Sequence, residues 1–429
     1  MSKVNLNKDF FVYIYYVLLL AVYLSWSNFN AVPGPIVRMV YFGATLVPVL
    51  LWKKNWLAAV ILLFYTLAKN SYSSSYLPAE NYTYLVAVLF ALVFVHTNNR
   101  MKIPMSLFLI LLVPLVINVF QGGSVEQISF ASFMIILLLL GIDKDDDEHF
   151  SMVSLSFIVI SVVLSVVYWL YGSNFAMSYY DFENERVGFS DINYVASIIG
   201  FGVMAALHGL MYEPRKKVFK VVLYIIVIGI AVITMFSNAS RGSLLALGVG
   251  IVVLIMFSNV SLRSKVLISV LVIGALIVLY KNNYMDLLLY RIEHDDTSGG
   301  TGRVDIWKDK WSVYSSSSSI LKILFGYGYE GGRRLGTVGG GFAFHNDYLA
   351  FLVEYGVLGA IVLLSFLFTP LLKSNKNNRP IVLASLAYLM TVGLTLEPLA
   401  AGRLPFYVIW LYAYLASNHV FQRIDKKRT

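Results

Sequence analysis

The feature that most constrains this chain is a series of apolar runs, most of them close to the ~20 residues that a helix needs to cross a bilayer. Fourteen such runs can be marked, and the third and fourth are short. We therefore predict an all-α polytopic membrane protein with 12–14 transmembrane helices. The runs centre on residues 10–27, 35–52, 56–69, 82–96, 103–120, 127–142, 151–171, 192–212, 218–236, 242–258, 264–280, 347–372, 380–396 and 403–419.

The composition supports one membrane domain rather than several soluble ones. Hydrophobic residues make up 58% of the 429 residues and charged residues 13%, a balance that soluble domains do not show. We therefore treat residues 1–429 as a single integral membrane domain. The absence of cysteine excludes a disulfide framework, a cysteine-based zinc site and a thiol nucleophile. The net charge of +9 is spread over short loops, which argues against nucleic acid as a partner.

The distribution of lysine and arginine predicts the orientation in the membrane. If all fourteen runs cross and the N-terminus is inside, the basic residues gather in the inside loops, as the positive-inside rule requires. Both termini are then cytoplasmic, and the long loop at 281–346 faces the periplasm of a bacterial inner membrane. The inside basic residues lie near positions 3–8, 53–54, 100–102, 144, 215–217, 263–265, 373–379 and 423–428.

The long loop contains one segment with the periodicity of an amphipathic helix. Val304, Trp307, Trp311 and Tyr314 follow one another at three- and four-residue spacing, which places them on one helical face. Tryptophan prefers the depth of lipid headgroups. We therefore predict a helix that lies on the membrane surface, bounded by the glycine-rich segments TSGGTG and GYGYEGG.

Four arginines are predicted at the outside face, against the orientation rule. Arg186 lies in an outside loop, Arg241 and Arg403 open predicted spans, and Arg303 opens the predicted surface helix. A guanidinium keeps its charge in a partly dry site and binds phosphate through a planar fork. Such a set predicts a pyrophosphate site. Taken singly, each arginine fits a contact with lipid headgroups or with a nearby acid about as well.

His345 lies where the long loop re-enters the membrane, in the segment GGGFAFHNDYL. A neutral imidazole is the usual general base near pH 7, although a histidine at a helix start is often only a cap. No second histidine stands at a metal-ligand spacing, and the glycine-rich segment before it lacks a phosphate-binding loop pattern. We expect neither a metal nor a cofactor. We expect the glycine-rich segment to form a loop near the substrate, with Arg333 and Arg334 in contact with glycan or phosphate.

Several motifs in the second half resemble the O-antigen ligase and polymerase superfamily of bacterial inner-membrane glycosyltransferases, which includes Wzy-type polymerases of O-antigen and capsule. The pieces run in the family's order over about 170 residues. They are RVGFSDIN at 186–193, SNASRG at 237–242, TGRVDIW at 301–307, GYGYEGG at 326–332 and HNDYLAFLVEYGVLG at 345–359. The first half contributes spans but no motif.

The resemblance implies a metal-independent transfer of a glycan from undecaprenyl pyrophosphate to an acceptor hydroxyl. In that reaction Arg241 and Arg303 would bind the pyrophosphate and His345 would activate the acceptor. The partners would be lipid-linked donor and acceptor oligosaccharides, membrane lipid and, as a further candidate, a chain-length regulator. The predicted substrate-binding residues are Arg186, Asn193, Ser240, Tyr327, Arg333, Arg334, Asn346 and Arg403.

Three functions remain open from the sequence. The HNDYL and GTGR segments favour a polymerase of repeat units over a ligase that transfers the glycan to the lipid A core. A flippase or other polysaccharide transporter would also have many spans, but it would more often show internal repeats and charges near the bilayer midplane. The chain shows no convincing repeat.

Overall fold

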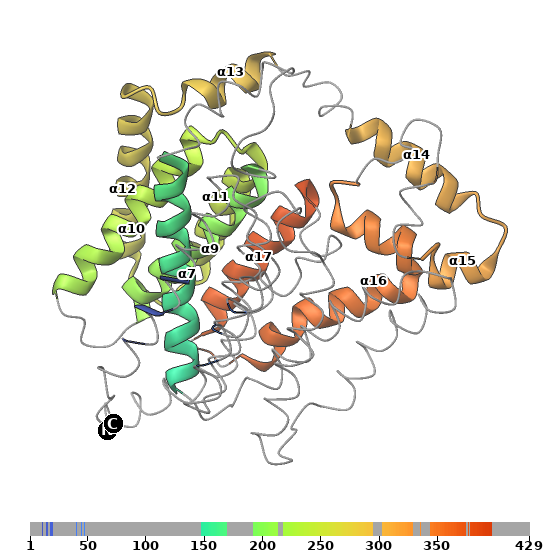
Figure 1. Ribbon diagram of the computed structural model, residues 1–429, viewed down its shortest axis with the longest axis horizontal. Coiled ribbons are helices and arrows are strands. Elements are labelled where there is room, and N and C mark those ends of the chain that lie inside the picture. Colours follow the sequence, from blue (N-terminus) through green and yellow to red (C-terminus); the bar gives the residue numbers. More distant parts are fainter. Residues whose placement is uncertain are drawn as a thin grey trace.

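The computed structural model describes ten helices between residues 147 and 395 (Figure 1). The described residues are 147–169, 192–212, 218–294, 303–328, 335, 344–374, 376 and 378–396, with eight single positions between 11 and 47. The helices are α7 (Asp147–Val167), α9 (Ile192–Tyr212), α10 (Val218–Ser237), α11 (Arg241–Phe257), α12 (Leu262–Lys281), α13 (Asp286–His294), α14 (Arg303–Ser315), α15 (Ile320–Phe325), α16 (Asp347–Lys373) and α17 (Arg379–Thr395).

Seven of these helices coincide with predicted apolar runs, and these described ranges contain no strand. Within them, Asn193–Met211 and Val218–Ser237 are long and apolar enough to cross a membrane, and the bent α16 adds a third if its two parts form one span. The all-α class is therefore confirmed for this part of the chain. The total of 12–14 spans and the single-domain assignment stay predictions, because most earlier runs and the last one lie outside the described residues.

The centre of the bundle is packed through small residues that let helices approach closely. A Cβ at Gly202 of α9 would meet the side chain of Ser161 in α7, and one at Gly200 would meet the Tyr388 ring of α17. The Tyr388 hydroxyl donates to the Ser197 carbonyl at 2.6 Å, so a buried polar group is satisfied between the two helices. Small residues at helix contacts are typical of proteins folded in lipid, where close packing replaces the hydrophobic effect.

Two helices expose apolar side chains over much of their surface. On α10, Phe219 is 75% exposed and Ile225 57%, and on α12 Val270 is 58% and Ile277 51% exposed. Apolar surface on this scale is unfavourable in water and is expected where a helix contacts lipid. Together with the candidate spans, these faces identify a membrane protein.

The segment 281–346 contains three helices, where the sequence predicted one. Helix α14 occupies the predicted position, but α13 precedes it and α15 follows it. The sequence signal of α13 and α15 is weak because they have nine and six residues, too few for a clear apolar period.

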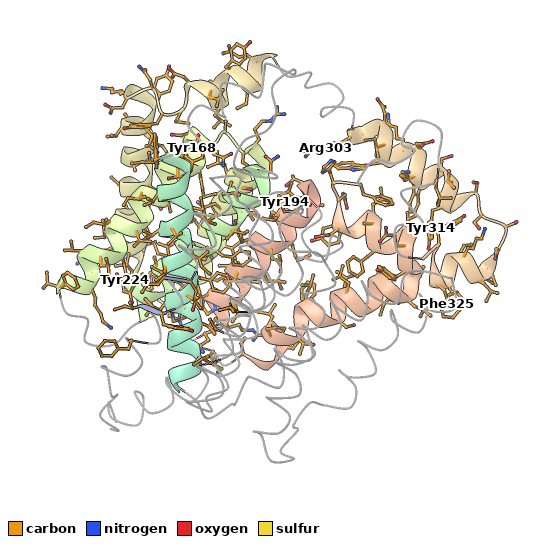
Figure 2. All side chains as sticks on the ribbon, viewed as in Figure 1. Tyr168, Tyr194, Tyr224, Arg303, Tyr314 and Phe325 are labelled. Carbon is orange, nitrogen blue, oxygen red and sulfur yellow. The ribbon has the colours of Figure 1, made fainter. Side chains whose placement is uncertain are left out.

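Helix α14 is partly covered by protein. Tyr314 is 4% exposed and Lys310 is fully buried, whereas Trp311 is 50% exposed. Tyr314, labelled in Figure 2, packs with Phe344 and Val353. An exposed Trp311 is compatible with the predicted contact with lipid headgroups, and the membrane depth of α14 stays a prediction.

Helix α16 has non-helical backbone angles at Gly356. Further along, its segments Asp347–Ile361 and Leu363–Leu372 are bent by 59° relative to each other. Gly356 has φ 69° and ψ −169°, a conformation almost restricted to glycine. The interruption leaves the Val353 and Glu354 carbonyls to accept backbone bonds of 2.9 and 2.8 Å from the two residues after Gly326. These bonds attach the segment that follows α15 to α16.

Candidate functional site

Four helices begin around the last turn of α17, and this convergence forms the candidate site. They are α9, α11, α14 and α16, which are far apart in the sequence. Figure 2 shows Arg303, at the start of α14, beside the C-terminal end of α17. Each of the four is placed there by a specific contact.

Helix α11 meets α17 at a glycine. A Cβ at Gly242 would lie 2.8 Å from the Thr395 Cβ, so the two backbones approach more closely than any larger residue permits. Arg241, the first residue of α11, is therefore held next to the end of α17. Its neighbour Ala239 has φ 55°, a left-handed turn that directs the chain from α10 into α11.

Helix α14 meets the same turn through its first residue. Nη1 of Arg303 donates to the Thr395 carbonyl at 2.9 Å. The last carbonyls of a helix lack intrahelical partners and carry partial negative charge, so a guanidinium is favourable there. Arg241 and Arg303, which are 62 positions apart in the sequence (303 minus 241), thus both adjoin Thr395.

The start of α16 packs against the preceding residues of α17. The Tyr348 hydroxyl donates to the Met390 carbonyl at 2.9 Å, and a Cβ at Gly393 would lie 3.1 Å from Asp347 Oδ2. His345 lies two residues before α16, with Nδ1 shielded from solvent. Its φ of 51° is uncommon for a residue with a side chain, and strain of this kind concentrates at functional sites.

The fourth helix, α9, is joined to α11 by hydroxyl groups. Ser240 Oγ donates to Asn193 Oδ1 at 3.0 Å, and Ser243 Oγ donates to the Asn193 carbonyl at 3.0 Å. Ser240 and Ser243 are fully buried, so these bonds fix the two helix starts relative to each other. The predicted substrate residues Asn193 and Ser240 are therefore close to Arg241.

The arrangement produces a positive region suited to an anion. A helix N-terminus carries about half a positive charge and presents unsatisfied N–H groups, which bind phosphate. Helix α11 has no acidic residue in its first turn, whereas Asp191 directly precedes α9 and Asp305 and Asp347 lie in the first turns of α14 and α16. The start of α11 and the guanidinium of Arg303 therefore both lie at the end of α17.

A groove of about 310 Å³ opens beside this cluster, between α14 and the first two turns of α16. Sequence reasoning treated its tryptophans as membrane contacts and did not single out its tyrosine, since only the fold brings them together. The lining residues are Trp307, Trp311, Asn346, Tyr348, Leu349 and Leu352.

Beneath the groove lies a buried lysine that sequence reasoning also missed. Lys310 is fully buried, donates to the Leu335 carbonyl and lies 5.8 Å from the centroid of the Phe344 ring. Burial lowers the pKa of Lys310, and the nearby Asp309 carboxylate partly offsets that effect. A lysine on an amphipathic helix normally lies on the solvent face, so the sequence pattern gave no indication that Lys310 is buried.

The remaining predicted site residues fall into two groups. Tyr327 contacts α14 and α15. Its hydroxyl donates to the Val313 carbonyl at 3.5 Å, and Lys322 Nζ lies 4.9 Å from its ring centroid. Asn346 caps α16 and lines the groove. The other predicted residues lie outside the described part of the chain, so their positions stay predictions: Arg186, Arg333, Arg334 and Arg403.

No group of three or more His, Asp or Glu side chains with the geometry of a metal site occurs among the described residues. His345, Asp347 and Glu354, which are close in the sequence, therefore do not form such a group.

Comparison with known proteins gives one family. No curated protein matches the chain significantly. Residues 226–364 match the family model described as O-antigen ligase, in the half of the chain where the motifs were recognised. That span runs from within α10 to within α16 and includes Arg241, Arg303 and His345. The predicted resemblance to the O-antigen ligase and polymerase superfamily, whose members transfer lipid-linked glycans, is confirmed over residues 226–364 of the chain.

Proposed function

We propose that the protein is an inner-membrane glycosyltransferase that polymerises oligosaccharide repeat units linked to undecaprenyl pyrophosphate, at the periplasmic face. The supporting observation is that the starts of α11, α14 and α16, which contain or closely follow Arg241, Arg303 and His345, pack against residues 390–395 of α17. A transferase of this kind must hold a pyrophosphate leaving group and a base near one sugar carbon, and this packing supports such an arrangement.

The proposed reaction is a displacement at the anomeric carbon of the donor glycan. The acceptor hydroxyl attacks that carbon, the new glycosidic bond forms, and the carbon–oxygen bond to the pyrophosphate breaks. His345 takes the hydroxyl proton, and undecaprenyl pyrophosphate leaves with the bonding electrons. Cleavage of the bond between the glycan and the pyrophosphate drives the transfer, so the reaction needs no additional energy source.

In this scheme Arg241 and Arg303 bind the pyrophosphate leaving group. Negative charge grows on the pyrophosphate as the bond breaks, and fixed guanidinium groups stabilise it without reorganising. The bond from Arg303 to the Thr395 carbonyl supports this role, because it fixes one arm of a fork that has five N–H donors. The start of α11, whose first turn has no acidic residue, adds positive potential at the same place.

A ligase that transfers the glycan to the lipid A core is the second candidate. The specific observation in its favour is the description of the matching family, which is O-antigen ligase. Both reactions use the same donor and leaving group, so the groups around Thr395 serve either one. The HNDYL and GTGR segments favour the polymerase.

A reconstituted assay tests the proposal. The purified protein is mixed with lipid-linked repeat units, with and without lipid A core, and the products are separated by size. We expect a ladder from repeat units alone, and little product from Arg303→Lys, which keeps the charge but loses the fork. A product that forms only with the core indicates the ligase, and no glycan transfer to either acceptor overturns the proposal.

A further inference from the structure

We propose that the groove between α14 and α16 binds a sugar ring of the acceptor glycan, with Trp311 as its stacking platform. The inference rests on the proposed transfer reaction, and it assigns the acceptor to one side of the site. It concerns Trp307, Trp311, Tyr348 and Asn346, which line the groove.

Two of the aromatic rings are held by their polar ends. Trp307 Nε1 donates to the Phe344 carbonyl at 2.7 Å, and the Tyr348 hydroxyl donates to the Met390 carbonyl at 2.9 Å. These bonds fix the ring orientations before any ligand arrives. An aromatic face held in this way suits the C–H-rich face of a sugar ring, because binding then costs little conformational entropy.

Trp311 is the exposed aromatic ring of the groove. It is 50% exposed and lies 6.1 Å from Tyr314, ring centroid to centroid, with an interplanar angle of 41°. Its removal should leave the packing of α14 intact, since the buried residues of that helix are Lys310 and Tyr314. Exposed tryptophans on a rigid helix are typical of recognition surfaces.

The amide of Asn346 adds a polar contact that a sugar can use. Its Oδ1 accepts from the Leu349 backbone N–H at 3.0 Å, which caps α16. The NH₂ end of the same group points away from that bond and carries two donors. A sugar hydroxyl can accept hydrogen bonds from these two N–H groups, whereas a polyprenyl chain has no acceptor atom for them.

The position and volume of the groove favour the acceptor sugar over the lipid chain as its ligand. Asn346, which lines the groove, follows His345 directly, so the groove lies next to the segment of the proposed base. A volume of about 310 Å³ lies at the lower end of the ~300–1,000 Å³ of typical ligand pockets. That space accommodates a monosaccharide at the end of a glycan rather than a long isoprenoid.

The test compares three replacements of Trp311 in the purified full-length protein. We expect Trp311→Leu and Trp311→Ala to raise the KM for acceptor about 5–10-fold, with donor KM unchanged, and Trp311→Phe to restore most of the loss because it keeps an aromatic face. Leu321→Ala, at a residue of α15 that is 64% exposed and outside the groove, is the matched control and should match wild type.

A binding measurement separates this inference from the proposed function. Lipid-free repeat-unit oligosaccharide should change the tryptophan fluorescence of wild type, and the change should be smaller in Trp311→Phe, in which Trp307 is the remaining tryptophan of the groove. Binding of this kind without any transfer in wild type would contradict the proposed function and leave the groove assignment standing. Normal acceptor KM in Trp311→Leu, or a raised donor KM alone, overturns the inference and indicates a membrane or lipid contact instead.

Discussion

Gly242→Ala is the substitution that most sharply tests whether the end of α17 organises the site. The added Cβ would lie 2.8 Å from the Thr395 Cβ, whereas ordinary Cβ contacts are 3.4–4 Å. The Thr395 hydroxyl can rotate away, but its Cβ cannot, because χ1 does not move that atom. Helices α11 and α17 must therefore separate by about 0.6–1.2 Å at this point.

The expected loss is large in activity and small in stability. Overpacking costs about 1–3 kcal/mol, and alanine recovers up to ~1 kcal/mol relative to glycine in a helix. The separation displaces Arg241 directly and Arg303 through its bond to the Thr395 carbonyl. Because a misplacement of ~1 Å can lower a rate ~100-fold, we expect kcat to fall about 10- to 100-fold.

The matched control lies in the same helix. Gly248 is six positions further along α11, and nothing lies within 4 Å of its added Cβ. Gly248→Ala should therefore keep full activity and equal or slightly higher thermal stability. Both variants are assayed for repeat-unit transfer and for melting temperature after purification. Wild-type kcat in Gly242→Ala would refute the reasoning, as would an equal loss in the control.

Three further variants and one treatment probe other parts of the account. Arg241→Lys should lower kcat at least about tenfold because lysine lacks the fork; full activity would indicate a headgroup contact. Gly356→Ala should lower the free energy of unfolding by about 2–5 kcal/mol, measured by thermal melting, while Gly229→Ala, with open space around its Cβ, should not. Lys310→Met should stabilise the protein at neutral pH, since the lowered pKa of Lys310 reflects a buried charge that is more costly in the folded state. That difference in melting temperature should shrink as pH rises through this lowered pKa toward the ordinary value; a constant difference would contradict the burial argument. Transfer activity should persist in chelator, and a loss that a divalent ion restores would contradict a metal-free reaction.

Helix positions were largely predictable from the sequence because each depends on a local pattern. The run predicted at 192–212 has the same bounds as α9, and α11 differs from its predicted run by one residue at each end. The arginine at the first position of α11 and of α14 was predictable for the same reason. A helix start follows from nearby residues, and a charged residue against the orientation rule is visible in the chain itself.

The contacts that assemble the site were not predictable in this way. Thr395 carries no motif, yet it meets both Gly242 and Arg303. Lys310 is polar in the sequence and buried in the fold, because a carbonyl and an aromatic ring receive it. Such pairings join residues far apart in the chain, and they leave no periodicity that a single sequence can show.

The measurement that tests the central claim most directly is a glycan gel from cells that lack this gene, complemented with wild type or with His345→Ala. The account predicts that long chains disappear without the gene while single repeats still reach the core, and that only wild type restores the ladder. The variant protein should accumulate in the membrane at a normal level. An unchanged ladder in the deleted cells, or a full ladder from His345→Ala, would contradict the account. Long chains that accumulate on the lipid carrier without attachment would assign the protein as the ligase.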